Sequence, residues 1–415
     1  MGPGLITGAA DDDPSGIATY SQTGAQFGFG QLWTAVFMLP FQVAIQEACA
    51  RIGAVTGHGL AYAVKKHYTR KVLIFMVVLI LVANTINIGA DIGAMASALQ
   101  LVTPFSFTPL TILITVSILA LEVLTSYRAY AKVLKWLSLS LLAYPLTLLI
   151  IHAPWATIIP ATFIPHIEFN FAFFFIITGV LGTTISPYMF FWQASEEVEE
   201  ERAHHLIKHG IVRVTARFMR SLRLDNLLGM IFSELGTWAI IIVTATVLNT
   251  HGITDIRTAS DAARALEPLV AGFPDAGYLA KLLFTTGILG LGLLSIPVLA
   301  GSAAYALAEA FNFREGLNLK LKQAHGFYGA ITIATLVGLL INYIGIDPIK
   351  ALVYTAVING FVAVPLIFLI AKISGNKKIM GKYHSGIISR LLTWITFFGM
   401  GAAAISTVLM LLKSG

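Results

Sequence analysis

The chain has 415 residues, of which 57% are hydrophobic and 12% charged, and its mean hydropathy is +0.80. A soluble domain usually carries about 25% charged residues, so this composition excludes an ordinary soluble protein. The formal charge of +6 does not point to nucleic acid, because most lysines and arginines lie between apolar segments. No nucleotide-binding loop, nucleophile elbow or cysteine metal cluster is visible. We therefore expect neither enzyme activity nor a resident cofactor.

Eleven apolar segments of membrane-spanning length follow one another along the chain. We expect them to be helices, because lipid offers no water to satisfy an open backbone. Lysine and arginine are concentrated in alternate loops, which predicts a multi-pass protein of the plasma membrane with its N-terminus in the cytoplasm. The predicted spans are about 3–29, 32–50, 72–101, 109–125, 133–152, 171–192, 227–249, 278–311, 327–344, 351–372 and 389–412.

The first span is interrupted by "DDDPSG", residues 11–16. Proline removes a backbone donor and disrupts a helix, and an acid inside a membrane marks an ion pathway by default. Asp13 stands directly at the interruption and is the candidate cation ligand. Asp11 and Asp12 either line the same pathway or are hydrated at its cytoplasmic mouth.

The sixth span is interrupted in the same way, by "GTTISP" at residues 182–187. Interrupted helices at matching positions of two repeats point to a transport site at the centre of the membrane, where unwound backbone can offer carbonyls to a cation. The pattern predicts an inverted repeat over residues 1–152 with helices 1–5, and a second over 153–372 with helices 6–10. Residues 373–415 would then form an additional eleventh helix.

Both interrupted segments carry a resemblance to a known family. "GPGLITGAADDDPSGIATYSQTGAQFGFGQLW" and "GVLGTTISPY" resemble the first and sixth spans of the NRAMP divalent-metal transporters, and weaker likeness extends over most of the chain. The resemblance implies an all-α, leucine-transporter-type fold that carries a divalent metal by alternating access. It also implies a substrate site in which Asp13, Thr183 and Ser186 bind the metal, with Gly16 and Tyr188 beside them.

The departures from the family pattern concern the ligands themselves. The family's asparagine falls on Gly16, its methionine on Ser186, its alanine on Thr183 and its histidine on Tyr188, and only Asp91 remains of an acidic pair in the third span. Thioether sulfur favours softer metals, whereas oxygen suits Mg²⁺, which keeps several waters. The sequence thus resembles the NRAMP-related magnesium transporters, and we expect a carrier of hydrated Mg²⁺, and also of Mn²⁺, without proton coupling.

Three alternatives stay open at this point. The chain could be a proton-coupled Mn²⁺/Fe²⁺ symporter, an organic-substrate symporter of the same fold, or a non-transporting membrane scaffold or receptor. The expected partners are the metal ion and the lipid bilayer, with no nucleic acid, and the expected state is a monomer. Asp12, Asp91 and Asn359 are possible accessory residues of the site.

A few further polar groups permit more than one interpretation. "EEVEEE", residues 196–201, is either a solvated helix end or a vestibule that attracts cations. Asn84 and Asn87 in the third span are expected to bridge helices. His205 and His209 have a spacing that can share a metal, but no third ligand is evident.

Overall fold

The computed structural model describes residues 7–8, 11–124, 142–203, 207–208, 211–212, 214–317 and 319–414. Nearly all regular structure in these ranges is helical, which confirms the predicted all-α fold. The described strands, β1 (Ile207–Lys208) and β2 (Ile211–Val212), form one short antiparallel pair.

The helices follow the predicted spans closely. The first half of the chain contains α2 (Pro14–Phe27), α3 (Trp33–Thr56), α4 (Leu60–His67), α5 (Arg70–Leu99), α6 (Phe107–Leu124) and α8 (Ala143–Ile150). The second half contains α9 (Trp155–Phe163), α10 (Phe171–Thr184), α11 (Pro187–Ala203), α12 (Ala216–Val247), α13 (Ala259–Ala263), α14 (Glu267–Val270), α15 (Ala276–Phe311), α16 (His325–Ile341) and α17 (Pro348–Ser374). The short helix α18 (Lys377–Met380) and the long helix α19 (Ile387–Ser414) complete it.

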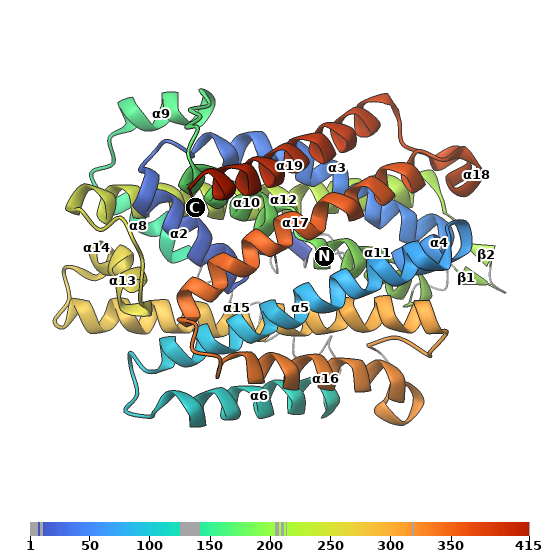
Figure 1. Ribbon diagram of the computed structural model, residues 1–415, viewed down its shortest axis with the longest axis horizontal. Coiled ribbons are helices and arrows are strands. Elements are labelled where there is room, and N and C mark those ends of the chain that lie inside the picture. Colours follow the sequence, from blue (N-terminus) through green and yellow to red (C-terminus); the bar gives the residue numbers. More distant parts are fainter. Residues whose placement is uncertain are drawn as a thin grey trace.

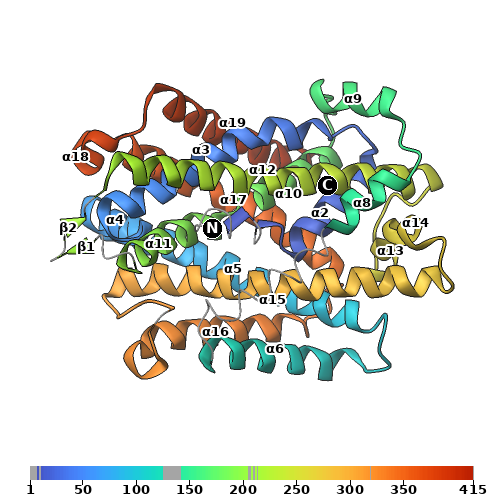
Figure 2. The ribbon, with the colours of Figure 1, turned by 180° about the vertical axis from the view of Figure 1, so that it is seen from behind.

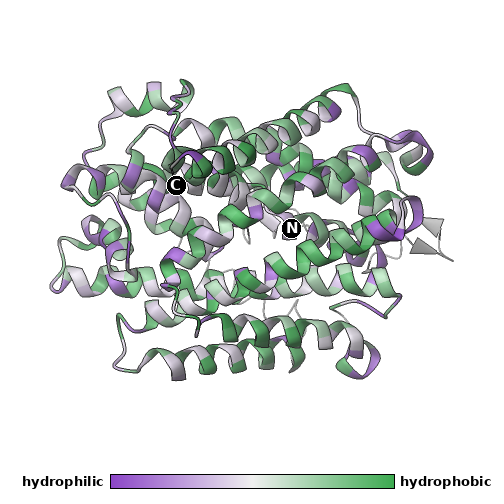
Figure 3. Cartoon of the chain, in the orientation of Figure 1, coloured by the Kyte–Doolittle hydropathy of each residue, from purple (hydrophilic) through white to green (hydrophobic). Residues whose placement is uncertain are grey.

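Several of these helices are long and apolar enough to cross a membrane. Within the described residues, 7 candidate spans reach this length, and two shorter apolar helices cover Phe107–Val123 and His325–Ile341. Apolar residues run along the helices, while hydrophilic residues gather at such places as α4 and α18 (Figure 3). The chain is therefore a multi-pass membrane protein, as predicted. The first part of the expected fifth span, residues 133–141, lies outside the described residues, and the rest contains α8.

One helix begins earlier than the sequence predicts. α12 starts at Ala216 rather than near residue 227, because the Thr215 side chain caps it by accepting a hydrogen bond from the Phe218 amide. Arg217 and Arg220 lie exposed on this first part. Apolar periodicity alone does not predict this first part of α12, because its charged turns lie outside the apolar run.

Each of several helices in the first half of the chain packs against the helix at the corresponding position of the second half. α2 contacts α10, α3 contacts α12, α5 contacts α15, and α6 contacts α16. Figure 1 shows α5 beside α15, with α6 and α16 forming the neighbouring layer, and Figure 2 shows α12 and α15 from the other side. An inverted repeat would produce this pairing. The division into residues 1–152, 153–372 and 373–415 stays a prediction.

Small residues before the interruption in the sixth span also serve helix packing. A Cβ at Gly182 would collide with the backbone of Ala356 and Gly360 in α17, and a Cβ at Gly360 would collide with Thr178 of α10. Glycine at both positions therefore lets the α10 and α17 backbones touch. This close approach holds the end of α10 in place beside the interruption.

Candidate metal-binding site

Asp13 forms the N-cap of α2 and starts the helix. Its backbone is extended, with φ −70° and ψ 173°, and Pro14 occupies the first helical turn. The Asp13 Oδ1 accepts hydrogen bonds from the Gly16 amide at 2.8 Å and from the Ser15 hydroxyl at 2.6 Å. Aspartate at the N-cap followed by proline is a favoured helix start. The "DPSG" sequence thus fixes a buried carboxylate at the point where the first span is interrupted.

Helix α5 presents two polar side chains toward this carboxylate. The Asn87 amide donates to Asp13 Oδ2 at 2.9 Å, and Asp91, one turn further, is near enough for its charge to interact with that of Asp13. Asp91 accepts a hydrogen bond from the Ser295 hydroxyl at 3.2 Å. Both side chains are buried, and Asn87 Oδ1 and Asp91 Oδ1 have no hydrogen-bond partner within the described ranges. Two acceptor oxygens therefore lie beside Asp13 without a donor.

Sequence reasoning missed Asn87, which was expected only to bridge helices. Its neighbour Asn84 does bridge, since the Asn84 amide donates to the Leu299 carbonyl at 2.8 Å and to Ser302 at 2.7 Å. The available signal was the spacing of four residues between Asn87 and Asp91, which places both on one face of a helix.

The interruption of the sixth span lies on the other side of Asp13. The Thr183 hydroxyl is 3.5 Å from the Ser15 hydroxyl, so Thr183 approaches the capping network. The Ser186 hydroxyl donates to the Thr183 carbonyl, and the Gln42 amide donates to the Thr184 carbonyl at 3.0 Å. The carbonyls that were expected to be free for a cation are thus occupied by side chains in this conformation. A carbonyl oxygen has two lone pairs, so a cation could use the remaining one at Thr183 or replace the Ser186 hydroxyl there.

Gly16 and Tyr188 complete the surroundings of Asp13. A Cβ at Gly16 would lie 3.2 Å from Thr183 Oγ1, 3.3 Å from Tyr20 Cε2 and 3.6 Å from Asp13 Oδ1, so glycine lets these groups pack closely around the start of α2. Tyr188 is fully buried, and its hydroxyl lies near the Asp13 carboxylate. That hydroxyl has no hydrogen bond of standard geometry with any described residue.

Asp11 and Asp12 belong to a separate buried group. The Ser233 hydroxyl of α12 donates to Asp11 at 3.2 Å and to Asp12 at 3.3 Å, and Gln42 also donates to Asp11. Both aspartates are buried, so the interpretation as a hydrated mouth is wrong for this conformation. Glu234 lies near enough for its charge to interact with both, and neither of its oxygens has a partner among the described residues. Sequence reasoning did not single out Glu234.

The other predicted groups lie on α17 and α11. Asn359 on α17 is buried, and its amide oxygen and nitrogen both lack partners within the described ranges. In the acidic segment after the sixth span, Glu197, Glu199 and Glu201 are buried, so a solvated helix end is wrong for them. Their element, α11, packs against α3 and α15, which covers these side chains. His205 and His209 lie outside the described residues.

The group around Asp13 offers mainly hard oxygen atoms. Carboxylate, hydroxyl, amide and carbonyl oxygens suit Mg²⁺, Ca²⁺ and Mn²⁺. Within the described ranges, no cluster of three or more histidine, cysteine, aspartate or glutamate side chains could hold a metal ion. A cation at Asp13 would therefore take one or two carboxylates, complete its shell with neutral oxygens or water, and pass through as substrate.

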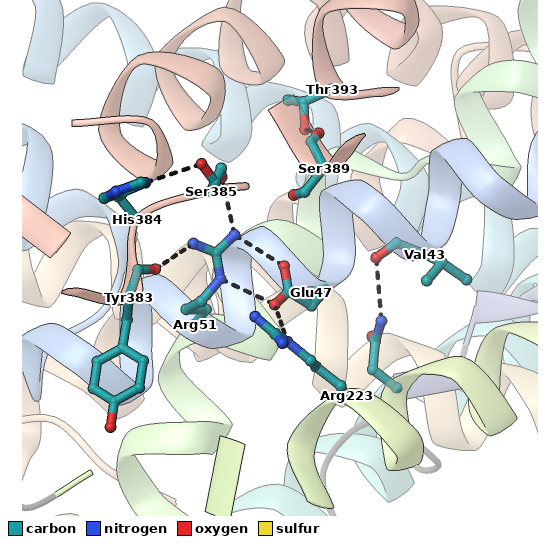
Figure 4. Close-up of polar contacts among 10 residues, drawn as sticks. Val43, Glu47, Arg51, Arg223, Tyr383, His384, Ser385, Ser389 and Thr393 are labelled. Carbon is teal, nitrogen blue, oxygen red and sulfur yellow. Dashed lines mark hydrogen bonds and ion pairs between the residues drawn. The ribbon is translucent and has the colours of Figure 1, made fainter. Parts of the chain in front are cut away.

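A second buried charged network has a different character. Arg51 on α3 pairs with Glu47 through two hydrogen bonds of 3.0 and 2.9 Å, and it donates to the Tyr383 carbonyl at 2.6 Å and to Ser385 at 3.0 Å. Arg223 of α12 donates to the same Glu47 at 3.0 Å. Figure 4 shows how these side chains join α3, α12 and the segment before α19. Each charge in this network has an opposite charge or a hydrogen-bond partner.

The fold, with two interrupted helices and buried acids at the first interruption, defines a membrane transporter of ions. The family model described as "Natural resistance-associated macrophage protein-like", Nramp, matches residues 4–410. The chain therefore belongs to the Nramp family.

Individual relatives agree with this assignment. The chain is 25% identical over 397 residues to a "Divalent metal cation transporter MntH" of Caldanaerobacter subterraneus subsp. tengcongensis, covering 94% of this chain and 88% of that one. A crystal structure of the Eremococcus coleocola manganese transporter aligns with a TM-score of 0.74 at 15% identity, covering 98% of this chain and 85% of that one. Mhp1, a nucleobase-cation-symport-1 family transporter, aligns at 0.58 with 11% identity, over 99% and 91% of the two chains.

These similarities confirm some of the sequence-based expectations and leave others without support. The family and the leucine-transporter-type fold are confirmed, and the protein is a transporter of divalent metal ions rather than an enzyme. The metal is accordingly cargo and not a cofactor. The magnesium branch, the preference for Mg²⁺ and the absence of proton coupling receive no support from the relatives. The alternative of a proton-coupled Mn²⁺ symporter fits them better.

Proposed function

We propose that this chain carries Mn²⁺ across a membrane by alternating access and that protons move with the metal. The proposed ligands are Asp13, Thr183 and Ser186, with Asn87 and Asp91 beside them. The observation that carries the proposal is the buried Asp13 carboxylate at the interruption of the first span, next to the acceptor oxygens of Asn87 and Asp91 that have no described donor.

The choice of Mn²⁺ is supported by the relatives and permitted by the ligands. One solved relative is named a manganese transporter, and the curated relative is named a divalent metal cation transporter. Oxygen donors suit Mn²⁺ as well as Mg²⁺. The loss of a thioether therefore does not argue against Mn²⁺.

Coupling to protons is supported by the additional buried acids. The sequence suggested that no titratable relay remained, but Asp11, Asp12 and Glu234 lie buried close to one another and next to the residue that caps α2. Acids held inside a membrane bundle are the usual components of proton relays.

Transport of Mg²⁺ without protons is the second candidate, and one specific observation favours it. Gly16 brings no side-chain ligand and Ser186 brings only a hydroxyl where the family motif carries asparagine and methionine, so a metal at Asp13 would take more of its shell from water. Mg²⁺ gives up its water reluctantly. A site that admits water would lower the advantage of Mn²⁺ over Mg²⁺.

A flux assay separates these possibilities. The full chain is reconstituted in liposomes that contain a pH dye, and uptake of Mn²⁺ and of Mg²⁺ is followed together with internal pH, with Asp13→Ala as the inactive control. We expect Mn²⁺ uptake with acidification that scales with flux. Equal uptake of Mg²⁺ without acidification would establish the second candidate instead. Uptake of neither ion would favour a non-transporting scaffold.

A further inference from the structure

A lateral groove lies between α3, α10 and α19, away from the ion site. It encloses about 250 Å³, and its walls include Met38 of α3, Ile177 of α10, and Gly399, Met400 and Ala403 of α19. Figure 1 shows α19 lying across α10 and α3. An apolar cavity of about 150 Å³ is enough to bind benzene, so this groove is large enough for an apolar ligand.

The chemistry of the walls excludes a polar ligand. No charged side chain lines the groove. The Trp33 indole donates to the His166 carbonyl at 3.3 Å, and the Thr396 hydroxyl donates to the Leu392 carbonyl at 2.8 Å, so these two polar groups already have partners and the Ser406 hydroxyl is the one further polar group of the lining. A ligand would therefore gain van der Waals contact and shape complementarity rather than hydrogen bonds.

The groove opens onto the surface that faces lipid. Helix α19 has the lowest buried share of the 7 candidate spans, 28%. Ile395 lines the groove and is 42% exposed, while Phe398 and Ile405 on the same helix are 66% and 62% exposed. The apolar surface of α19 in the bilayer thus continues without a polar barrier into the groove.

We propose that the groove binds an acyl chain of a bilayer phospholipid. Its inner wall includes Ile185, which is fully buried and ends α10 next to Ser186. A lipid tail in the groove packs against Ile177 and Leu181 of α10, one turn before the interruption of the sixth span, with Ile185 buried behind them. The membrane thereby contacts the sixth span, whose two halves, α10 and α11, must move relative to each other during alternating access.

Gly399 provides a test that fills the groove without disturbing the fold. A Cβ at Gly399 would meet no atom within 4 Å, so Gly399→Leu extends into open space. Gly329 on α16 is the matched control, because a Cβ there also meets nothing within 4 Å and Gly329 does not line the groove. Both glycines lie within helices.

The experiment uses full-length protein in phosphatidylcholine vesicles that contain phosphatidylcholine with a diazirine on one acyl chain. After irradiation, peptide mass spectrometry maps the adducts. We expect adducts on the inner wall, at Ile177, Leu181 and Ala403, which Gly399→Leu abolishes and Gly329→Leu leaves unchanged. Adducts on the outer face of α19 should persist in both variants.

Two results would overturn the proposal. Inner-wall adducts that survive Gly399→Leu would show that the label does not depend on the groove. Inner-wall labelling by a free diazirine fatty acid alone, without labelling by the phospholipid, would assign the groove to another ligand. If Gly399→Leu fails to fold, Ser406→Leu on the same wall gives the equivalent measurement. Neither outcome depends on whether the chain carries Mn²⁺ or Mg²⁺.

Discussion

Two buried polar groups of this protein differ in how their charges are satisfied. In the network of Glu47, Arg51 and Arg223, acid and base face each other, and the spare donors of Arg51 reach the Tyr383 carbonyl and Ser385. Around Asp13 the described residues supply no base, and Asn87 and Asp91 keep acceptor oxygens without donors. A buried charge is normally paired, so the first group is complete by itself, whereas the second lacks a positive charge. This difference favours a structural role for the first group and supports the proposal that the second binds a cation.

We expect the largest effect on transport from removing the Asp13 carboxylate, which has no basic partner among the described residues. We expect Asp13→Ala to abolish Mn²⁺ uptake into liposomes, because no other described carboxylate caps α2 at the interruption. The unfolding midpoint should change little, since the lost cap costs only about 1 kcal/mol. The exposed Asp255 provides the control, and Asp255→Ala should transport normally. Near-normal uptake by folded Asp13→Ala protein would contradict the site assignment.

The paired network should respond in the opposite way. Arg51→Met removes one partner of a buried ion pair and leaves the Tyr383 carbonyl without its donor, so we expect a loss of about 3 kcal/mol in the free energy of unfolding. Protein that remains folded should bind Mn²⁺ with unchanged affinity. Thermal unfolding in detergent and calorimetric Mn²⁺ titration measure the two quantities. The exposed Arg220 supplies the control variant Arg220→Met. A large loss of Mn²⁺ affinity at unchanged stability would contradict the structural role.

A smaller effect is expected from changing a ligand without removing it. Ser186→Met replaces a hydroxyl beside the Thr183 carbonyl by a thioether, which favours softer metals. We expect the ratio of Mn²⁺ to Mg²⁺ flux to rise several-fold. Ser186→Ala is the control, because it removes the hydroxyl without adding sulfur. An unchanged flux ratio in Ser186→Met would show that this side chain does not face the metal.

The last effect concerns an acid outside the membrane-spanning helices and bears on the pH dependence of stability rather than on transport. Burial, with the nearby Glu309 charge, raises the pKa of Glu315 from 4.5 to about 9. The folded state thus binds this proton more tightly than the unfolded state, so the free energy of unfolding falls as pH rises from about 4.5 to about 9. Glu315→Gln should flatten this part of the stability profile, measured by unfolding across that range. An identical profile for both proteins would show that Glu315 ionises freely.

The sequence predicts the parts of this structure that are set locally. Proline and glycine positions located both interruptions, and "DPSG" placed Asp13 at a helix start. Asn87 was missed because its spacing from Asp91 places both on one helix face but does not show that the Asn87 amide meets Asp13, 74 positions away. Arg51 and Tyr383 are 332 positions apart, so only the folded packing brings them together. The Ser186 hydrogen bond to Thr183 was missed for another reason, since it depends on the conformation of the interruption itself.

The central claim is that a cation supplies the positive charge that the Asp13 group lacks. Anomalous X-ray diffraction from crystals grown with Mn²⁺ locates the metal directly. We predict a manganese peak in contact with the Asp13 carboxylate and within reach of Thr183, Ser186 and Asp91, absent from Asp13→Ala crystals. A peak only beside Asp11, Asp12 and Glu234, or a peak that persists in Asp13→Ala, would contradict the assignment.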